Sequence, residues 1–160
     1  MIISNATPLI SFARINQLPL LQKVIGTLVI PTGVAQEIAV YQSTQSGSIN
    51  LPQESWIQTR PLSSDQQVQL LLPSLDQGEA EVIALALELR PQLVLMDELT
   101  GRKVAESLGL TVSGSVGVLI RAKKLGYLPE IKPYLQQMKQ SGIYFSDRFI
   151  QGILTQVNET

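Results

Sequence analysis

Four oxygen-bearing side chains could supply a catalytic centre, and they are Asn5, Glu37, Glu79 and Asp97. Asn5 directly follows the apolar run 2–4, and Asp97 directly follows the apolar run 93–96. Because the carboxyl ends of parallel strands meet at one edge of a sheet, we expect these two side chains at the same edge. Carboxylate and amide oxygens suit Mg²⁺ or Mn²⁺, so the chemistry available to such a set is metal-assisted phosphodiester hydrolysis.

Helical periodicity places two of these residues on apolar helix faces. Glu37 falls between Val34 and Ile38 on the stripe of one predicted helix. Glu79 opens the apolar stripe of another, whereas Glu81 belongs to a more polar face of the same helix. A carboxylate that faces inward needs a hydrogen-bonding partner or a metal ion, so both positions are candidates for a buried site.

Each of the four residues also has a purely structural interpretation. Asn5 and Asp97 could cap the helices that follow them. Glu37 could be a boundary residue whose carboxylate reaches solvent. Glu79 could close a capping box with Asp76, in the pattern Asp76-Gln-Gly-Glu79. The shared location at strand ends and on inward helix faces of one sheet favours a common site over four independent coincidences.

The residue inventory narrows the chemistry further. The chain has no His and no Cys, which excludes thiolate nucleophiles, imidazole bases and zinc fingers. Carboxylates gathered without Lys or Arg repel one another and raise one another's pKa, and a hard divalent cation relieves that repulsion. The net charge of −1 argues against nucleic-acid binding by bulk attraction, although a local basic patch could still bind phosphates.

The elements that must position these residues alternate between strands and helices. Apolar runs predict strands at 1–4, 27–30, 92–96 and 110–112, with an edge strand at 56–59. Helices are predicted at 9–14, from 18 onward, and at 33–41, 63–72, 79–89, 100–108, 116–125, 130–140 and 147–156. The polar stretch 42–55 is a predicted loop. This alternation predicts an α/β fold with a mainly parallel sheet covered on both faces.

Length and composition bound the domain count and the location. A chain of 160 residues with 44% hydrophobic side chains predicts a single domain over residues 1–160. Its apolar runs are far shorter than the ~20 residues that a membrane span needs. No basic segment followed by a long apolar run stands at the start, so no signal peptide is predicted. We expect a soluble, cytoplasmic protein without a membrane segment.

The chain resembles the PIN-domain superfamily, and more closely a bacterial branch of PIN-like proteins, in five segments. In chain order they read ISNATPLISFARI, VIPTGVAQEI, LDQGEAEVIALALE, LVLMDELTGRKVAESLGL and VSGSVGVLIRAKKLG. The resemblance implies a three-layer α/β/α fold and a ribonuclease that depends on Mg²⁺ or Mn²⁺. It also selects Asn5, Glu37, Glu79 and Asp97 as the metal-binding and catalytic residues.

The sequence departs from the family pattern at Asn5, where PIN nucleases usually have Asp. An amide donates an oxygen to a metal ion but brings no negative charge. Glu98 could supply a replacement carboxylate for the metal, and Thr7 could position a water or a phosphate. Arg102 and Lys103 could contact RNA phosphates. The alternatives for these four residues are surface charges and a helix cap.

Two functions stay open at this point. The resemblance implies the toxin of a type II toxin–antitoxin pair, an endoribonuclease inhibited by a small antitoxin protein and commonly assembled as a homodimer. The alternative is a catalytically impaired PIN-fold module that binds RNA or a partner protein. A flavodoxin-like nucleotide-binding protein is disfavoured, because Asn5-Ala-Thr-Pro8 offers no glycine-rich phosphate loop.

Overall fold

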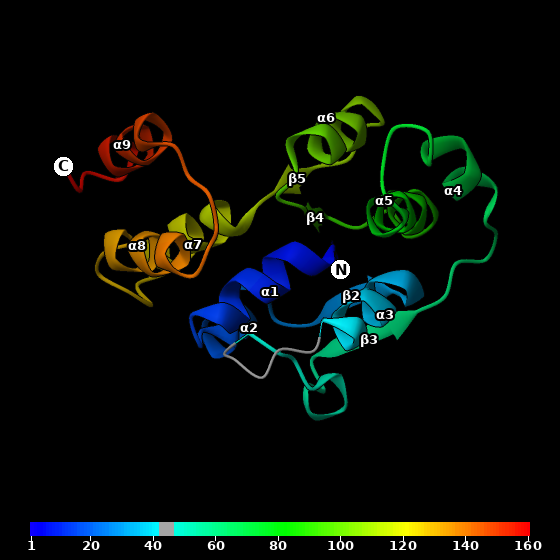
Figure 1. Cartoon of the computed structure of the whole chain (residues 1–160), viewed down its shortest axis with the longest axis horizontal. Coiled ribbons are helices and arrows are strands. Elements are labelled where there is room, and N and C mark those ends of the chain that lie inside the picture. The colour runs from blue at the N-terminus through cyan, green and yellow to red at the C-terminus, as the bar shows by residue number, and fades with distance from the viewer. Residues whose placement is uncertain (42–46) are drawn as a thin grey trace.

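The computed structural model describes residues 1–41 and 47–160, and its framework is a five-stranded parallel sheet (Figure 1). The strands are β1 (Ile2–Ser4), β2 (Leu28–Pro31), β3 (Ile57–Arg60), β4 (Leu93–Leu95) and β5 (Val112–Ser113). They lie in the order β3-β2-β1-β4-β5, and each neighbouring pair is parallel. The α/β class and the parallel sheet predicted from the alternation of elements are therefore confirmed.

Helices connect the strands and flank the sheet. They are α1 (Ala6–Arg14), α2 (Leu18–Ile25), α3 (Thr32–Val40), α4 (Gln66–Leu71), α5 (Gln77–Leu89), α6 (Leu99–Ser107), α7 (Ser115–Lys124), α8 (Lys132–Gln140) and α9 (Asp147–Gln156). In Figure 1, α5 and α6 lie on one side of the sheet and α1 and α7 on the other. This arrangement is the predicted three-layer fold. Within the described part of the chain, no helix is long and apolar enough to cross a membrane.

The core explains why the central elements read as continuous apolar runs. Every residue of β1 and of β2 is buried, as expected for parallel strands that are covered on both faces. The central part of helix α5 is also buried, and its residues 82–86 are at most 1% exposed. A helix that is apolar over most of its surface packs inside a protein, and α5 contacts β1, β2, α3 and α4.

Some element boundaries differ from the prediction for local reasons. Helix α1 begins at Ala6, three residues earlier than predicted, so that Asn5 is its N-cap residue. Strand β5 begins two residues later than predicted, because the Leu110 N–H is bonded to the Ala105 carbonyl in the turn that ends α6. Of the predicted loop, residues 42–46 lie outside the described residues, and the remainder contains a single 3₁₀ turn at Leu51–Gln53.

The strand order reverses at the pair β1 and β4. From β1 the chain moves outward to β2 and β3, whereas from β4 it moves to β5 on the opposite side. Ser4 pairs with Leu95 across the two strands, and the Asn5 N–H donates to the Leu95 carbonyl at 2.9 Å. Such a reversal opens a crevice at the carboxyl ends of the two strands. Asn5 and Asp97, which follow these strands, therefore lie at the same edge of the sheet.

Candidate functional site

Three acceptor side chains surround Gly78 in the first turn of α5. Oxygens of Glu37, Asn5 and Asp76 lie 2.8, 3.3 and 3.6 Å from the place where a β-carbon on Gly78 would stand. They come from α3, from the end of β1 and from the N-cap of α5, respectively. We call this arrangement the Gly78 cradle. A β-carbon at this point would force the Glu37 carboxylate to move away, so glycine is what allows that carboxylate to approach.

Asn5 contributes an oxygen that has no hydrogen-bond partner in the part of the chain that the structure describes. It occupies the N-cap position of α1, but its side chain forms no capping hydrogen bond. The residue is 4% exposed, and within the described part of the chain its Oδ1 is a buried acceptor without a hydrogen bond. An unsatisfied buried acceptor costs about 1–3 kcal/mol, so this oxygen is poised for a ligand such as a cation. The capping interpretation of the Asn5 side chain is not supported by its contacts.

Glu37 combines a solvent-exposed position with an inward carboxylate. Its neighbours on the helix stripe, Val34 and Ile38, are buried, whereas Glu37 itself is exposed. Its Oε1 nevertheless reaches the Gly78 cradle. The pKa of Glu37 is raised, first because its carboxyl is partly removed from water and second because the charge of Asp76 is close.

Glu79 forms the capping box and also faces other acidic groups. Its N–H donates to Asp76 Oδ1 at 2.8 Å, and its Oε1 accepts from the Asp76 N–H at 3.1 Å. Its second oxygen lies 2.9 Å from the place of a β-carbon on Gly101, in the first turn of α6. Burial raises the pKa of Glu79, as do the nearby charges of Asp76 and Glu98, against the opposing hydrogen bond from the Asp76 backbone.

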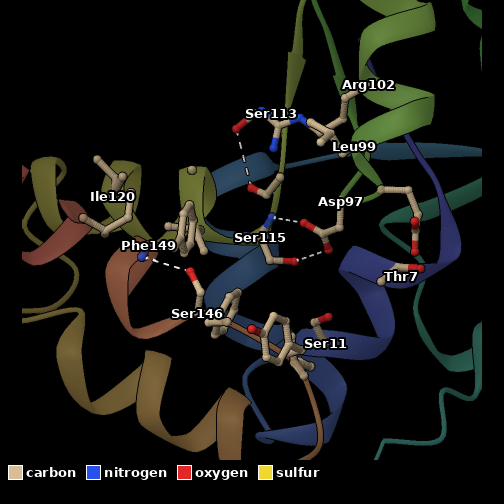
Figure 2. A pocket seen from close by; sticks show the side chains of 18 residues that line it. Thr7, Ser11, Asp97, Leu99, Arg102, Ser113, Ser115, Ile120, Ser146 and Phe149 are labelled. Carbon is tan, nitrogen blue, oxygen red and sulfur yellow. Dashed lines mark hydrogen bonds between the residues drawn. The ribbon is translucent and has the colours of Figure 1, made fainter. Parts of the chain in front are cut away.

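Asp97 is held in a fixed orientation by the start of α7. Its Oδ1 accepts from the Ser115 N–H and its Oδ2 from the Ser115 hydroxyl, both at 2.7 Å (Figure 2). Gly114 permits this approach, because a β-carbon there would stand 2.6 Å from Asp97 Oδ1. The carboxylate thus caps α7 and not the helix that follows it directly in sequence. A carboxylate has more than two acceptor positions, so Asp97 retains capacity for a further ligand.

The predicted site residues fall into two groups. Asn5 and Glu37 meet in the Gly78 cradle, whereas Asp97 and Glu98 line a pocket on the side of α6 and α7. Glu79 connects the groups electrostatically, because the charge of Glu98 raises its pKa. Among the residues that the structure describes, no three acidic, His or Cys residues are arranged closely enough to hold a metal ion.

The chemistry of the donors still fits a hard divalent cation. All of them are oxygens, and hard cations prefer oxygen ligands. Among the described residues the Oδ1 of Asn5 has no hydrogen-bond partner, and the pKa values of Glu37 and Glu79 are raised, chiefly by burial and further by the charge of Asp76. A cation bound in the cradle would coordinate the Asn5 oxygen and would also stabilise the charged form of these carboxylates.

The pocket beside Asp97 has a volume of about 730 Å³ (Figure 2). Its walls are the first turns of α1, the segments that follow β4 and β5, and the C-terminal segment 143–153. Thr7 and Arg102, two of the predicted RNA-binding residues, line it, whereas Lys103 is exposed on α6 and is not part of the lining. Within the described part of the chain, the guanidinium group of the half-buried Arg102 forms no hydrogen bond or ion pair.

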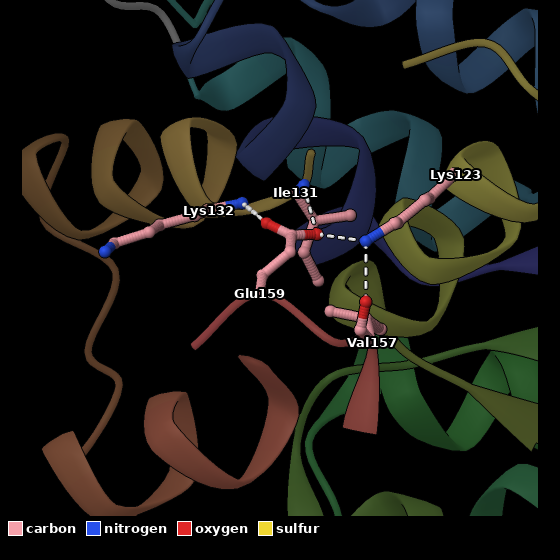
Figure 3. Close-up of polar contacts among 5 residues, drawn as sticks. All are labelled: Lys123, Ile131, Lys132, Val157 and Glu159. Carbon is pink, nitrogen blue, oxygen red and sulfur yellow. Dashed lines mark hydrogen bonds and ion pairs between the residues drawn. The ribbon is translucent and has the colours of Figure 1, made fainter. Parts of the chain in front are cut away.

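A partly buried ion pair between Lys123 and Glu159 ties the end of the described chain to the body of the protein (Figure 3). Glu159 accepts from Lys123 Nζ at 2.8 Å and from the N–H groups of Ile131 and Lys132 at 2.9 and 3.0 Å. Lys123 Nζ also donates to the Val157 carbonyl at 2.7 Å. Burial raises the pKa of Glu159, but the hydrogen bonds outweigh it and hold this pKa below its ordinary value. We call these contacts of Lys123 and Glu159 the Glu159 clamp. It joins α7, the start of α8 and the chain that follows α9.

Sequence reasoning missed three kinds of residue in this region. Asp76 was recognised only as a cap, although the Gly at position 78 signalled close approach of other groups. Ser115, the partner of Asp97, stands at the start of a predicted helix but gives no sign of a contact 18 residues away. Tyr144 lines the pocket from a segment without periodicity, and no local signal identifies it.

Comparisons with known proteins support the assignment of the fold. A family model described as a PIN domain matches residues 1–159. No curated protein matches the chain. The match spans both the Gly78 cradle and the pocket beside Asp97.

Replacing Gly78 with Ala tests whether the cradle binds a cation. The added methyl group displaces Glu37 from Asn5, so we expect the Gly78→Ala variant to lose the increase in melting temperature that Mn²⁺ causes in the wild type. Without metal its free energy of unfolding should be unchanged or up to about 1 kcal/mol higher, because Ala favours helix. The control is Gly152→Ala on α9, where a β-carbon meets nothing within 4 Å. If Mn²⁺ raises the melting temperature of the wild type and of both variants equally, the cradle does not bind the cation.

The same measurement has a defined pH dependence. The pKa values of Glu37 and Glu79 are raised in the folded protein, so these groups still bind protons at a pH at which the unfolded chain has released them. Protons therefore compete with the cation, and stabilisation by Mn²⁺ should grow as the pH rises from the ordinary glutamate value of 4.5 toward neutrality. An effect that is flat over this range would contradict binding by these carboxylates.

Replacing Glu159 tests the clamp. We expect Glu159→Gln to lower the free energy of unfolding at neutral pH by about 1–2 kcal/mol, because charge-assisted hydrogen bonds are lost. The folded-state pKa is lowered, so the stabilisation is present above the ordinary value of 4.5 and disappears as the pH falls through the folded value. The control, Asp147→Asn, removes an ion pair in which Asp147 is 92% exposed, and it should cost about 0.5 kcal/mol or less. Similar losses in the two variants in chemical denaturation would argue against the clamp.

Proposed function

We propose, from the premise that the chain belongs to the PIN-domain family, that it is a metal-dependent endoribonuclease. Membership of this family points to a nuclease-type function, to RNA as the substrate and to a divalent metal ion. The observation that carries the proposal is the buried Oδ1 of Asn5, which has no hydrogen-bond partner among the described residues and lies beside the Glu37 carboxylate. An oxygen without a donor, next to a carboxylate of raised pKa, is an arrangement that a cation completes.

In this proposal the metal ligands are Asn5, Glu37, Glu79 and Asp97, with Glu98 as an additional carboxylate. Asp76 belongs with them because its Oδ1 faces the same cradle. The chemistry that Mg²⁺ or Mn²⁺ supplies at such a centre is a bound water of lowered pKa and neutralisation of phosphate charge. That chemistry needs no His, in agreement with the residue inventory.

The remaining roles fall to residues around the pocket. Ser115 fixes the orientation of Asp97, which can then accept a proton from an attacking water. The Arg102 guanidinium, which lines the pocket and has no partner among the described residues, binds the phosphate. The Thr7 hydroxyl donates to a phosphate oxygen or a water from the first turn of α1. Lys103 contacts the RNA outside the pocket, from the exposed face of α6.

We also propose that the nuclease is the toxin of a type II toxin–antitoxin pair and acts in the cytoplasm. The support is the resemblance of five segments to the bacterial PIN-like branch. Its partner is then a small antitoxin protein that covers the carboxyl edge of the sheet, and the toxin itself is a homodimer. Expression of the chain alone should arrest bacterial growth, and Glu37→Gln should abolish the arrest. Arrest that persists in this variant would show that toxicity does not come from the acidic site.

One observation favours a second function, a module that binds RNA or a partner protein without cleaving RNA. Among the described residues, the acidic side chains do not form a compact group of three. The neutral amide of Asn5 lowers the negative charge at the cradle further. In this alternative the pocket and Arg102 bind RNA, and metal affinity is too weak for catalysis.

RNA cleavage separates the two functions. A mixed panel of RNAs is incubated with Mg²⁺ or Mn²⁺ and the wild type, Glu37→Gln, Glu79→Gln or Asp97→Asn. We expect each of these variants to lose at least about 10- to 100-fold in rate, because a metal ligand or its support is removed. Glu106→Gln, an exposed carboxylate elsewhere on α6, is the matched control and should cleave like the wild type.

Asn5→Asp provides the decisive comparison. The new carboxylate should raise metal affinity in calorimetry and increase cleavage, but lower the melting temperature without metal because a buried charge is then unpaired. Cleavage by Asn5→Asp together with an inactive wild type would establish the impaired module. If neither protein cleaves RNA and neither binds divalent ions, both the nuclease and its metal site are refuted.

A further inference from the structure

Aromatic side chains form one wall of the pocket beside Asp97. Tyr144 is 86% exposed and Phe149 is 43% exposed, and both line the pocket. Phe145 stacks on Phe149 with ring centroids 5.8 Å apart and an interplanar angle of 20°. We call Tyr144, Phe145 and Phe149 the aromatic wall. Large exposed aromatic surface in a concave site marks a binding surface, because a folded protein gains nothing by leaving it in water.

Polar side chains also line the pocket. Arg102 brings a guanidinium group that has no partner among the described residues, and Thr7, Ser11 and Ser113 bring hydroxyl groups. Asp97 lines the pocket too, at the carboxyl edge of the sheet. The pocket therefore combines aromatic surface with hydrogen-bonding groups and one cation. Its volume of about 730 Å³ falls within the range for sites that bind small molecules.

Helix α9, which carries Phe149 of the aromatic wall, is held in place before any ligand binds. Ser146 caps α9 through its hydroxyl, which accepts from the Phe149 N–H at 3.1 Å (Figure 2). The Glu159 clamp fixes the chain beyond the other end of this helix. A ring positioned before binding lowers the ordering cost of binding.

We propose that the pocket is a base-binding subsite for single-stranded RNA, in which one nucleobase stacks on the aromatic wall. Arg102 contacts the adjoining phosphate, at the edge where Asp97 stands. This subsite rests on the proposed function, because it assumes that RNA is the ligand. Stacking on aromatic side chains needs unpaired bases, so duplex RNA is excluded. Stacking also provides affinity that does not depend on bulk charge, which suits a chain of net charge −1.

Equilibrium binding without metal tests the subsite independently of cleavage. Fluorescence anisotropy of a labelled, short single-stranded RNA is measured in the presence of a chelator. Tyr144→Ala should bind about 10-fold more weakly than the wild type, and Tyr144→Phe, which keeps the stacking surface, should bind like the wild type. The control is Tyr127→Ala, since Tyr127 is 40% exposed and packs on Lys23 away from the pocket. This control should leave RNA affinity unchanged.

Abasic substitution in the RNA identifies the stacked base. Removing the nucleobase at one position should weaken wild-type binding by about 10-fold, and the same change should have little further effect on Tyr144→Ala. Equal binding by Tyr144→Ala and the wild type, or equal affinity for duplex and single strands, overturns the subsite. So does a wild type that binds no RNA.

The outcome is separable from that of the nuclease proposal. A wild type that binds single strands through Tyr144 but cleaves nothing supports the subsite and refutes the nuclease. If the wild type and Tyr144→Ala cleave RNA at the same rate and bind it with the same affinity, the nuclease proposal is supported and the subsite is refuted. If Tyr144→Ala converts a dimer into a monomer in sedimentation without changing RNA affinity, the aromatic wall belongs to a contact between two copies and the subsite is wrong.

Discussion

The parallel pairing of β1 with β4 is the contact on which the geometry of the whole site depends. Ser4 is in register with Leu95, and the Asn5 N–H continues the ladder to the Leu95 carbonyl. Because side chains alternate between the faces of a strand, a slip of one residue would turn Asn5 away from the acidic edge. The same pair also marks the reversal of strand order, so that α5 and α6 bring their first turns to this edge while α1 and α7 approach from the other face.

Helix starts, and not basic side chains, hold the carboxylates of this edge in position. Asp76 and Glu79 bond to backbone N–H groups at the start of α5, and Asp97 to that of Ser115 at the start of α7. Glu81, on the more polar face of α5, accepts from the Gly33 N–H at 3.0 Å and serves the start of α3 in the same way. The positive ends of helices stabilise anions without neutralising them. The edge is therefore ordered and remains acidic.

The fold could be predicted from the sequence because its cause is local. Buried parallel strands must be short apolar runs, and the helices between them show their periodicity directly. Asn5 could be placed because it ends a strand, and Glu79 because it opens an apolar stripe. Periodicity reports which face a residue occupies but not which residue it meets. The bond between Asp97 and Ser115 and the position of Tyr144 depend on how α7 and α9 pack, so no local pattern contains them. Asp76 was visible only in its capping role, because its second neighbour, Glu37, is distant in sequence.

The amide of Asn5 has a consequence for how the proposed centre would respond to its surroundings. With an amide in place of a carboxylate, the centre carries one negative charge fewer, so it holds a divalent ion less tightly and repels an approaching phosphate less. The two effects oppose each other: weaker metal binding lowers turnover, whereas weaker repulsion of the phosphate raises it. In the proposed nuclease, the occupancy of such a centre would rise and fall with the free concentration of the ion, and activity would follow that occupancy.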